Sequence, residues 1–423
     1  MYYIYCFFKW IFFIYKFMNN HKYYLNEPLG GIEFKKELIR LGILGIKFGQ
    51  YLQTRNDLVS EEVRNVLESL FNENYIHSLD ETLNILKKHN VYDKFDHIDE
   101  IIGSGSIAQT YSVRLNGYTG KYVLKILHPH VIYLDSDIFI LKFIIKMINK
   151  YNGKLLNINW ESFFEYICHQ QNLCQEYQNL VRFREIYKDF PTIEIPEPFF
   201  YSKDFLVMSF CEGVSLNKIK DHDILENVSK IVTASFLHTT LKYYFAHGDL
   251  HPVNILVKKK GIALIDFGLC LDAKKDISDH FVHFYKSLAD PTNKEYAYLL
   301  VSGIIDERNI HNQLVDYNEI TIEWIEYNKK ETPKDIFDTD TTKSLNLFIN
   351  FLREKELVSN GLIINFLLQF NILNSYTPNN IIKSLHYMKR NWFFVNELGY
   401  NINEMFDAQV KITHPSISKM FED

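Results

Sequence analysis

The chain has 423 residues, and at about 150 residues for a typical domain this length predicts two to three domains. It carries 46 Lys and Arg against 52 Asp and Glu, a net charge of −6, which argues against a nucleic-acid-binding protein that relies on a broad basic face. Because 47% of the residues are hydrophobic and only 23% are charged, intrinsic disorder is excluded and a large core can form.

Residues 1–20 form a hydrophobic N-terminal segment. Of the first 18 residues all are apolar or aromatic except Lys9 and Lys16, which lie seven residues apart and so share one helix face. A bilayer-spanning helix needs about 20 apolar residues, and no small-residue cleavage site of a secretory signal follows. We expect a membrane anchor, either spanning the bilayer or lying in its interface with snorkelling lysines. The alternative is a buried N-terminal helix.

Residues 32–95 are predicted to form a helical extension. Apolar residues recur there at helical spacing, and Ser60 is a candidate N-cap, with Val63 opening the next apolar stripe.

The pattern changes near Ile101. Runs at 111–115 and 122–127 flank an Asn-Gly turn and predict a hairpin, residues 132–187 return to helical spacing, and residues 199–210 have strand character. From residue 214 the chain is predicted to be mainly helical, apart from a hairpin at 255–265.

The five cysteines, an odd number with irregular spacing and no Cys-x-x-Cys, predict neither a disulfide framework nor a zinc site. They fit a reducing compartment, either cytosol-like or an organellar matrix.

The most informative stretch is His247-Gly-Asp249-Leu-His251-Pro-Val-Asn254, followed by Asp266-Phe-Gly. Phosphoryl transfer accounts for this ordered set. Asp249 would orient or deprotonate the acceptor, and Asn254 and Asp266 would hold Mg²⁺ through oxygen ligands. The hairpin between them should set Asn254 and Asp266 side by side. A rival interpretation, a metal cluster of His-x-Asp-x-His, would need further ligands; in the kinase-like interpretation His247 is structural.

A flexible loop and a lysine lie upstream of these acids. The loop, predicted to cover the phosphates, comprises Gly103, Ser104, Gly105, Ser106, Ile107, Ala108 and Gln109. Lys125 stands in an otherwise apolar strand, which is costly unless the amine is paired, and its expected partners are the α and β phosphates and Glu176. The alternative for Glu176 is a solvated helix-face charge. Residues 205–213 resemble a hinge beside an adenine slot, where Met208 is a candidate nucleotide contact.

These residues resemble the UbiB family of aarF-domain-containing atypical kinases. The resemblance is carried by Lys47-Phe-Gly-Gln50, Thr54-Arg55-x-Asp57-Leu58, Ser106-Ile-Ala-Gln109-x-Tyr, Lys125-Ile-Leu-His128-Pro129 and the His247–Asn254 stretch, and it runs from about residue 35 to about residue 290. It implies that Lys47 and Gln50 gate the nucleotide pocket and restrict access to a small or lipid-like substrate. It also implies a membrane setting and support of isoprenoid quinone biosynthesis.

Three departures from the family pattern stand out. The usually alanine-rich loop contains Gly103 and Gly105 here, and the family's Glu-x-Asp aligns with Gln170-Gln171-Asn172, so both acids have become amides. Glu176 keeps its place. No Ala-Pro-Glu motif follows Asp266, which weakens an ordinary protein-kinase interpretation.

We therefore expect an α+β, two-lobed protein-kinase-like fold. Residues 32–95 form its helical extension, 96–213 a small antiparallel lobe of five strands with a helical insert, and 214–423 a helical large lobe. The expected function is Mg²⁺-dependent phosphoryl transfer from ATP to water or to a small or lipid-like acceptor, near a membrane and without nucleic acid. The alternatives are a nucleotide-binding scaffold with little catalysis and a small-molecule kinase of the aminoglycoside or choline kinase type.

Overall fold

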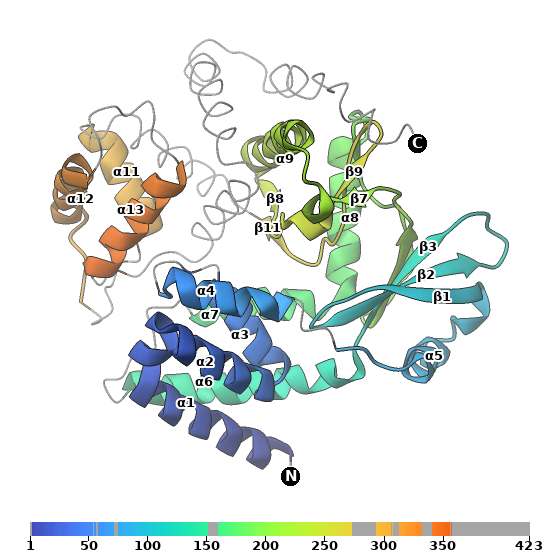
Figure 1. Ribbon diagram of the computed structural model, residues 1–423, viewed down its shortest axis with the longest axis horizontal. Coiled ribbons are helices and arrows are strands. Elements are labelled where there is room, and N and C mark those ends of the chain that lie inside the picture. Colours follow the sequence, from blue (N-terminus) through green and yellow to red (C-terminus); the bar gives the residue numbers. More distant parts are fainter. Residues whose placement is uncertain are drawn as a thin grey trace. The chain divides into compact units, whose positions relative to one another are not determined.

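The computed structural model forms two compact units. Figure 1 shows their helices and strands, coloured along the sequence. The first comprises residues 1–175 with 198–210, and the second comprises residues 176–197 with the chain from residue 211 onward. Residues 176–197 thus lie in the second unit, although they fall inside the stretch predicted as the small lobe. The structure describes residues 2–53, 55, 58–71, 75–150, 160–272, 293–305, 307, 313–331, 341–355 and 357.

The first unit begins with a helical layer. Its helices are α1 (Tyr2–Asn26), α2 (Pro28–Arg40), α3 (Ile43–Gln53), α4 (Glu61–Glu68) and α5 (Leu79–Lys88), with a short 3₁₀ turn, η1 (Ser69–Phe71), after α4. Ser60 caps α4 as predicted, because its Oγ accepts a hydrogen bond from the main-chain N–H of Val63. Helices α2 to α5 occupy most of the stretch 32–95 that was expected to be helical, α1 precedes it, and Phe95 already belongs to the first strand.

Helix α1 lies against the unit through one face only. Its buried face carries Trp10, Phe13 and Phe17, whereas Phe8, Phe12 and Tyr15 on the opposite face are about two-thirds exposed. Within the described part of the chain, no helix combines the length and the apolarity needed to cross a bilayer.

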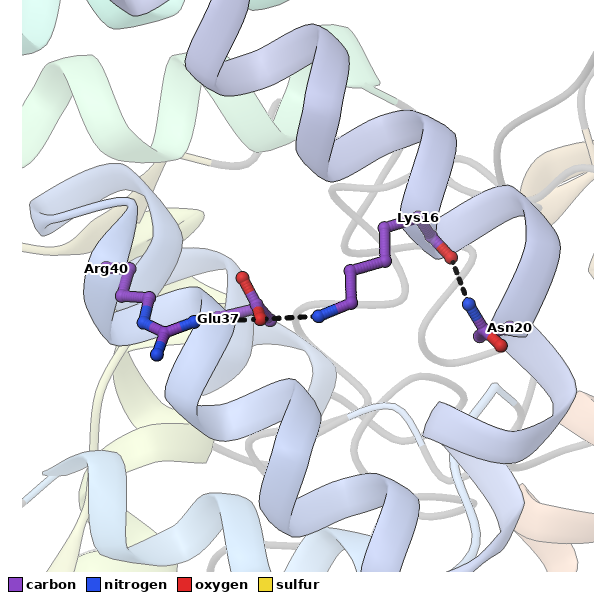
Figure 2. A network of polar contacts seen from close by, with 4 residues as sticks. All are labelled: Lys16, Asn20, Glu37 and Arg40. Atoms are coloured by element: carbon purple, nitrogen blue, oxygen red, sulfur yellow. Dashed lines mark hydrogen bonds and ion pairs between the residues drawn. The ribbon is translucent and has the colours of Figure 1, made fainter.

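The two lysines of α1 fasten it to its neighbours. Lys16 Nζ donates to Glu37 Oε1 of α2 at 2.7 Å, and Arg40 donates to the same oxygen at 3.1 Å (Figure 2). Lys9 pairs with Asp137 at 3.1 Å, and Trp10 Nε1 donates to that carboxylate at 2.8 Å. The prediction of snorkelling lysines is therefore wrong, because both amines are held by carboxylates of the protein.

A five-stranded antiparallel sheet, with the order β1-β2-β3-β6-β5, completes this unit. Its strands are β1 (Phe95–Ser104), β2 (Ala108–Leu115), β3 (Tyr122–Leu127), β5 (Pro198–Tyr201) and β6 (Phe205–Ser209). The predicted five strands and the hairpin around Asn116-Gly117 are confirmed, with Gly117 at φ +81° in the turn. The core beneath the sheet includes Tyr111, Leu124, Ile126 and Val207.

Three helices interrupt the sheet in sequence: α6 (Leu134–Lys150), α7 (Trp160–Gln170) and α8 (Leu173–Tyr187). The helical spacing predicted for residues 132–187 thus corresponds to several helices, with a break between the end of α7 at Gln170 and the start of α8 at Leu173. Asn172 starts α8 by accepting a hydrogen bond from the main-chain N–H of Cys174 at 3.1 Å.

The second unit contains more strands than the sequence pattern predicted. One sheet has the order β4-β10-β9-β7 and a second pairs β11 with β8. The strands are β4 (Ile193–Glu194), β7 (Val214–Ser215), β8 (Phe245–His247), β9 (Ile255–Lys258), β10 (Gly261–Leu264) and β11 (Cys270–Asp272). The helices are α9 (His222–Tyr243), α11 (Lys294–Ile304), α12 (Tyr317–Glu331) and α13 (Thr341–Glu354). The β9–β10 hairpin was predicted, but the two- and three-residue strands β7, β8 and β11 were missed because they are too short for a periodic signal.

Candidate nucleotide and phosphoryl-transfer site

The predicted phosphate loop connects β1 to β2. Its turn is closed by a hydrogen bond from the main-chain N–H of Gly105 to the carbonyl of Ala108 at 2.9 Å. Gly103 and Gly105 are exposed, whereas Ser106 and Ile107 are buried. The side chain of Gln109 is fully buried, and its amide bonds the main chain of His77. The exposed glycines therefore form the tip of the loop, and Gln109 supports it from within.

Lys125 occupies the middle strand of the small sheet. It lies in β3, opposite Thr110 of β2 and Leu206 of β6, and is half-buried. Met208, the predicted contact at the hinge, is buried in β6 opposite Val123.

The Lys-x-Gly-Gln motif lies on α3. Gln50 is buried and its Nε2 donates to the carbonyl of Leu70 at 3.1 Å, which joins α3 to the turn η1. A Cβ at Gly49 would lie 2.3 Å from Leu70 Cδ1 and 2.8 Å from Leu38 Cδ1, so a larger residue here would force these buried leucine side chains to shift. Lys47 is half-buried on the same helix. The gating roles of Lys47 and Gln50 remain predictions, and Thr54 and Asp57 of the neighbouring motif lie outside the described residues.

In the second unit, the predicted acid and amide are in direct contact. Asn254 Nδ2 donates to the carbonyl oxygen of Asp249 at 3.0 Å and to its carboxylate at 3.2 Å. Asn254 belongs to the 3₁₀ turn η5 (Pro252–Asn254), which leads directly into β9. Because the amide nitrogen faces Asp249, the amide oxygen is the atom of Asn254 that could ligate a cation.

Asp266 joins this group through the β9–β10 hairpin. Leu264 pairs with Ile255, and the N–H of Ile265 donates to the carbonyl of Asn254 at 2.9 Å, so the hairpin places Ile265, the residue before Asp266, beside Asn254. Asp266 itself has φ +61°, a left-handed conformation that is uncommon outside glycine. Asp266 Oδ1 accepts from the N–H of Gly268 at 3.2 Å.

His247 supports the loop that carries Asp249. Its Nδ1 accepts from the N–H of Asp249 at 3.1 Å, and its Nε2 lies 3.3 Å from the carbonyl of Ile265. No three His, Cys, Asp or Glu side chains gather as a metal site within the ranges that the structure describes. The structural role predicted for His247 is confirmed, and the rival metal cluster is not formed.

Glu176 is only 1% exposed on α8, which excludes the alternative that it is a solvated helix-face charge. Burial raises the pKa of the Cys270 thiol well above its ordinary value, and the carboxylates of Glu176 and Asp266 raise that pKa further. The carboxylates of Glu176 and Asp266 therefore both lie close enough to Cys270 to influence its thiol. Lys125 belongs to the first unit and Glu176 to the second, so their ion pair remains a prediction.

Sequence reasoning missed several supporting residues. Asn179 on α8 donates to the carbonyl of Phe267 at 2.8 Å and so fixes the Asp-Phe-Gly segment. His77 bonds His128 beneath the phosphate loop. A lone Asn in a helix and two histidines separated by 51 residues give no sequence signal that these contacts form.

One unit carries a small antiparallel sheet with a glycine-containing loop and a strand lysine. The other carries an acid and an amide before a hairpin and a second acid after it. These features define a protein-kinase-like protein. The family model described as "ABC1 atypical kinase-like domain" matches residues 63–299, more than half of the chain. The chain therefore belongs to the ABC1 family of atypical kinases, also known as the UbiB family, as its motifs predicted.

Curated relatives carry the same family name. Protein ACTIVITY OF BC1 COMPLEX KINASE 3, chloroplastic, from Arabidopsis thaliana is 27% identical over 320 residues, covering 69% of this chain and 44% of that protein. A mitochondrial ABC1 family protein of Saccharomyces cerevisiae is 28% identical over 330 residues, covering 66% and 50%. The chain thus spans about half the length of the curated relatives it matches.

Among solved structures, Rv3197 of Mycobacterium tuberculosis, in complex with erythromycin, aligns with a TM-score of 0.43 at 14% identity. That alignment covers 78% of this chain and 91% of the other.

Proposed function

We propose that this protein binds ATP with Mg²⁺ and transfers the γ-phosphoryl group to water or to a small or lipid-like acceptor. The observation that carries the proposal is the contact of Asn254 with Asp249, with Asp266 brought alongside by the hairpin. Asp249 would orient the attacking hydroxyl or water and accept its proton. In keeping with the family resemblance, we place the acceptor in isoprenoid quinone or lipid metabolism.

The donor set suits magnesium. Asp266 offers a carboxylate and Asn254 an amide oxygen, and hard divalent cations prefer such oxygen ligands. When bound, the ion would neutralise charge on the phosphates. The chain's own residues would then bind and orient the nucleotide, with Lys125 on the α and β phosphates, Glu176 holding Lys125, and residues 103–109 over the phosphate chain.

Nucleotide-dependent thermal unfolding tests this binding. Mg-ATP should raise the melting temperature of the wild type, and this rise should be lost in Lys125→Met. Lys121→Met is the matched control, because Lys121 is exposed and immediately precedes the same strand. No shift in the wild type, or an equal shift in Lys125→Met, would overturn the proposal.

One observation favours a second candidate, a nucleotide-binding scaffold with little catalysis. Asn172, which stands where the family has an acid, serves as the N-cap of α8, and Gln171 beside it donates to Asp135 at 2.6 Å. Asn172 thus has a structural partner, and neither Gln170 nor Asn172, the two amides that replace the family's acids, supplies charge. A clear Mg-ATP shift without turnover would favour the scaffold.

We also propose that the protein attaches to a membrane surface, on the matrix side of an organellar membrane. Two neighbouring helices of the first unit support this. On α1, Ile4, Tyr5, Phe8, Phe12 and Tyr15 are each at least 64% exposed. On α6, the exposed residues Phe139, Phe143 and Met147 alternate with the exposed residues Lys142, Lys146 and Lys150. Exposed aromatics beside lysines suit the interface of an anionic bilayer.

Co-sedimentation with vesicles containing anionic phospholipid tests the attachment. Replacing Phe8 and Phe12 by Ser should abolish binding without lowering the melting temperature, because both side chains are already in solvent. Leu79→Ser, an exposed apolar residue at the start of α5, is the control. Equal sedimentation of the double variant and the wild type would contradict the proposal.

A further inference from the structure

Two buried histidines lie directly beneath the phosphate loop. His77 and His128 are 2% and 1% exposed, and their Nδ1 atoms are 2.7 Å apart. The other nitrogen of His128, Nε2, lies 2.9 Å from the carbonyl oxygen of Gly105 in the loop. The other nitrogen of His77 lies 2.8 Å from Thr82 Oγ1 of α5. All of these residues belong to the first unit, so this geometry is internal to it.

The chemistry of the partners fixes the direction of each hydrogen bond in this relay, which runs from Gly105 through His128 and His77 to Thr82. A carbonyl can only accept, so His128 Nε2 carries a proton and donates to Gly105. In a neutral ring His128 Nδ1 must then accept, which makes His77 Nδ1 the donor and leaves His77 Nε2 to accept from the Thr82 hydroxyl. With both rings neutral, each ring thus holds one proton, and every nitrogen of the two rings has a hydrogen-bond partner.

Burial is consistent with two neutral rings. It lowers the pKa of His128 to about 4 and also lowers the pKa of His77. The charged or titratable groups that act on the pair are Glu81, which favours protonation, and His130, which opposes it and stacks on His128. Burial outweighs Glu81 at both rings, so the relay stays intact near neutral pH.

Further hydrogen bonds connect the phosphate loop to the segments that carry His77 and His128. Ser104 Oγ donates to the carbonyl of Tyr75, and the N–H of His128 donates to the carbonyl of Ile107 at 2.9 Å. Gln109 accepts from the N–H of His77 at 3.1 Å. The segment before α5 and the segment after β3 therefore hold the loop between them.

The bond to Gly105 determines which way one peptide group points. The carbonyl of Gly105 and the N–H of Ser106 belong to the same planar trans peptide, in which the two groups point in opposite directions. While His128 holds the carbonyl inward, the N–H of Ser106 points away from the histidines. A flip of this peptide would present a carbonyl oxygen to the phosphates in place of a donor, and glycine at position 105 makes such a flip easy.

We propose that His77 and His128 are positioning residues for the nucleotide phosphates, and that their relay locks the Gly105–Ser106 peptide with its N–H toward the anion. This inference rests on the proposed nucleotide binding and deepens it. Neither histidine contacts the nucleotide. His128 acts through the loop main chain, and His77 fixes the tautomer and the orientation of the His128 ring.

Two conservative substitutions of His128 separate the roles of its nitrogens. In His128→Gln the side-chain amide can reproduce the Nε2–H donor to Gly105, whereas in His128→Asn the amide sits near the position of Nδ1 and cannot reach Gly105. The dissociation constant for Mg-ATP and the turnover rate should be measured for both variants well below their melting temperatures. His89→Gln is the control, because His89 pairs with Asp204 elsewhere in the same unit.

We expect His128→Asn to weaken Mg-ATP binding by tenfold or more, and His128→Gln to stay within threefold of the wild type and of His89→Gln. His77→Asn, which keeps a donor toward His128, should bind more tightly than His77→Ala. If folded His128→Asn binds as tightly as the wild type, or if the Gln and Asn variants weaken equally, the positioning role is refuted while nucleotide binding stands. Absence of binding by the wild type would instead refute the proposed function.

Discussion

The side-chain amide of Asn254 donates to both the carbonyl oxygen and the carboxylate of Asp249, at 3.0 and 3.2 Å. One amide thus restrains the predicted base while its own oxygen is directed elsewhere. An aspartate in its place would have no donor and would set two carboxylates against each other. The contact therefore accounts for an amide, and not a third acid, at this position.

Asn254→Asp should accordingly lower the free energy of unfolding by about 1–3 kcal/mol, the cost of losing a buried donor and gaining like-charge repulsion. Chemical denaturation measures this. Asn217→Asp, at an exposed asparagine, should change stability by less than about 0.5 kcal/mol. Equal losses in the two variants would show that the contact with Asp249 does not matter for the fold.

The left-handed backbone of Asp266 makes a second prediction. Asn tolerates φ +61° at least as well as Asp, so Asp266→Asn should keep the fold while removing the charge of the metal ligand. The melting temperature without ligand should be unchanged, and the extra stabilisation that Mg²⁺ adds to ATP should disappear. Asp266→Val, a β-branched residue, should instead be destabilised by about 1–3 kcal/mol even without ligand. A Mg²⁺ effect that persists in Asp266→Asn would remove this residue from the metal site.

The glycine of Lys-x-Gly-Gln provides a test of packing. Because a Cβ at Gly49 would collide with Leu70 and Leu38, Gly49→Ala should cost about 1–3 kcal/mol of stability despite the better helix propensity of Ala. Gly105→Ala is the contrast, since its Cβ would meet nothing closer than 3.8 Å. The free energy of unfolding of Gly105→Ala should equal that of the wild type. The alanine that is typical of the family at this loop would then fit here as well. If Gly49→Ala is the more stable of the two, the close contact is wrong.

Much of the fold followed from the sequence because its signals are local. The Ser60 cap, the Asn116-Gly117 hairpin and the hairpin after Asn254 each depend on neighbouring residues, and all three form. The sequence pattern changes visibly only near Ile101, whereas strand β1 begins at Phe95, because the alternation of β1 is interrupted by several register shifts against β2.

The contacts that support the site could not be predicted in the same way. His77 and His128 are 51 residues apart, and Gln50 and Leu70 are 20 residues apart, so both contacts depend on how separate elements pack. Glu176 could be placed on a helix from its spacing, but its burial could not. Pairs distant in sequence leave no periodic pattern, so tertiary packing decides them.

The buried histidines predict a pH dependence of stability. The pKa of His128 is lowered to about 4 in the folded protein, below the ordinary value of 6.5, so the unfolded chain binds more protons between these values. Stability contributed by the neutral ring is fully present above about pH 6.5 and is lost as the pH falls toward 4, by on the order of 3 kcal/mol.

Denaturation at pH 7 and pH 5 measures this loss. Burial also lowers the pKa of His238, in the second unit, to about 4. His238 should therefore add a similar pH dependence of stability. His128→Gln cannot titrate, so its loss between the two pH values should be smaller than that of the wild type. Equal losses would mean that His128 is not buried as a neutral ring.

Turnover of ATP tests the central claim most directly. The release or transfer of the γ-phosphoryl group should be measured with and without Mg²⁺ for the wild type and for Asp249→Asn, together with the thermal shift that Mg-ATP produces. We predict Mg²⁺-dependent turnover in the wild type and a loss of at least about 100-fold in Asp249→Asn, with the thermal shift retained. Equal turnover in the two proteins would contradict the assignment of phosphoryl transfer to Asp249 and its neighbours.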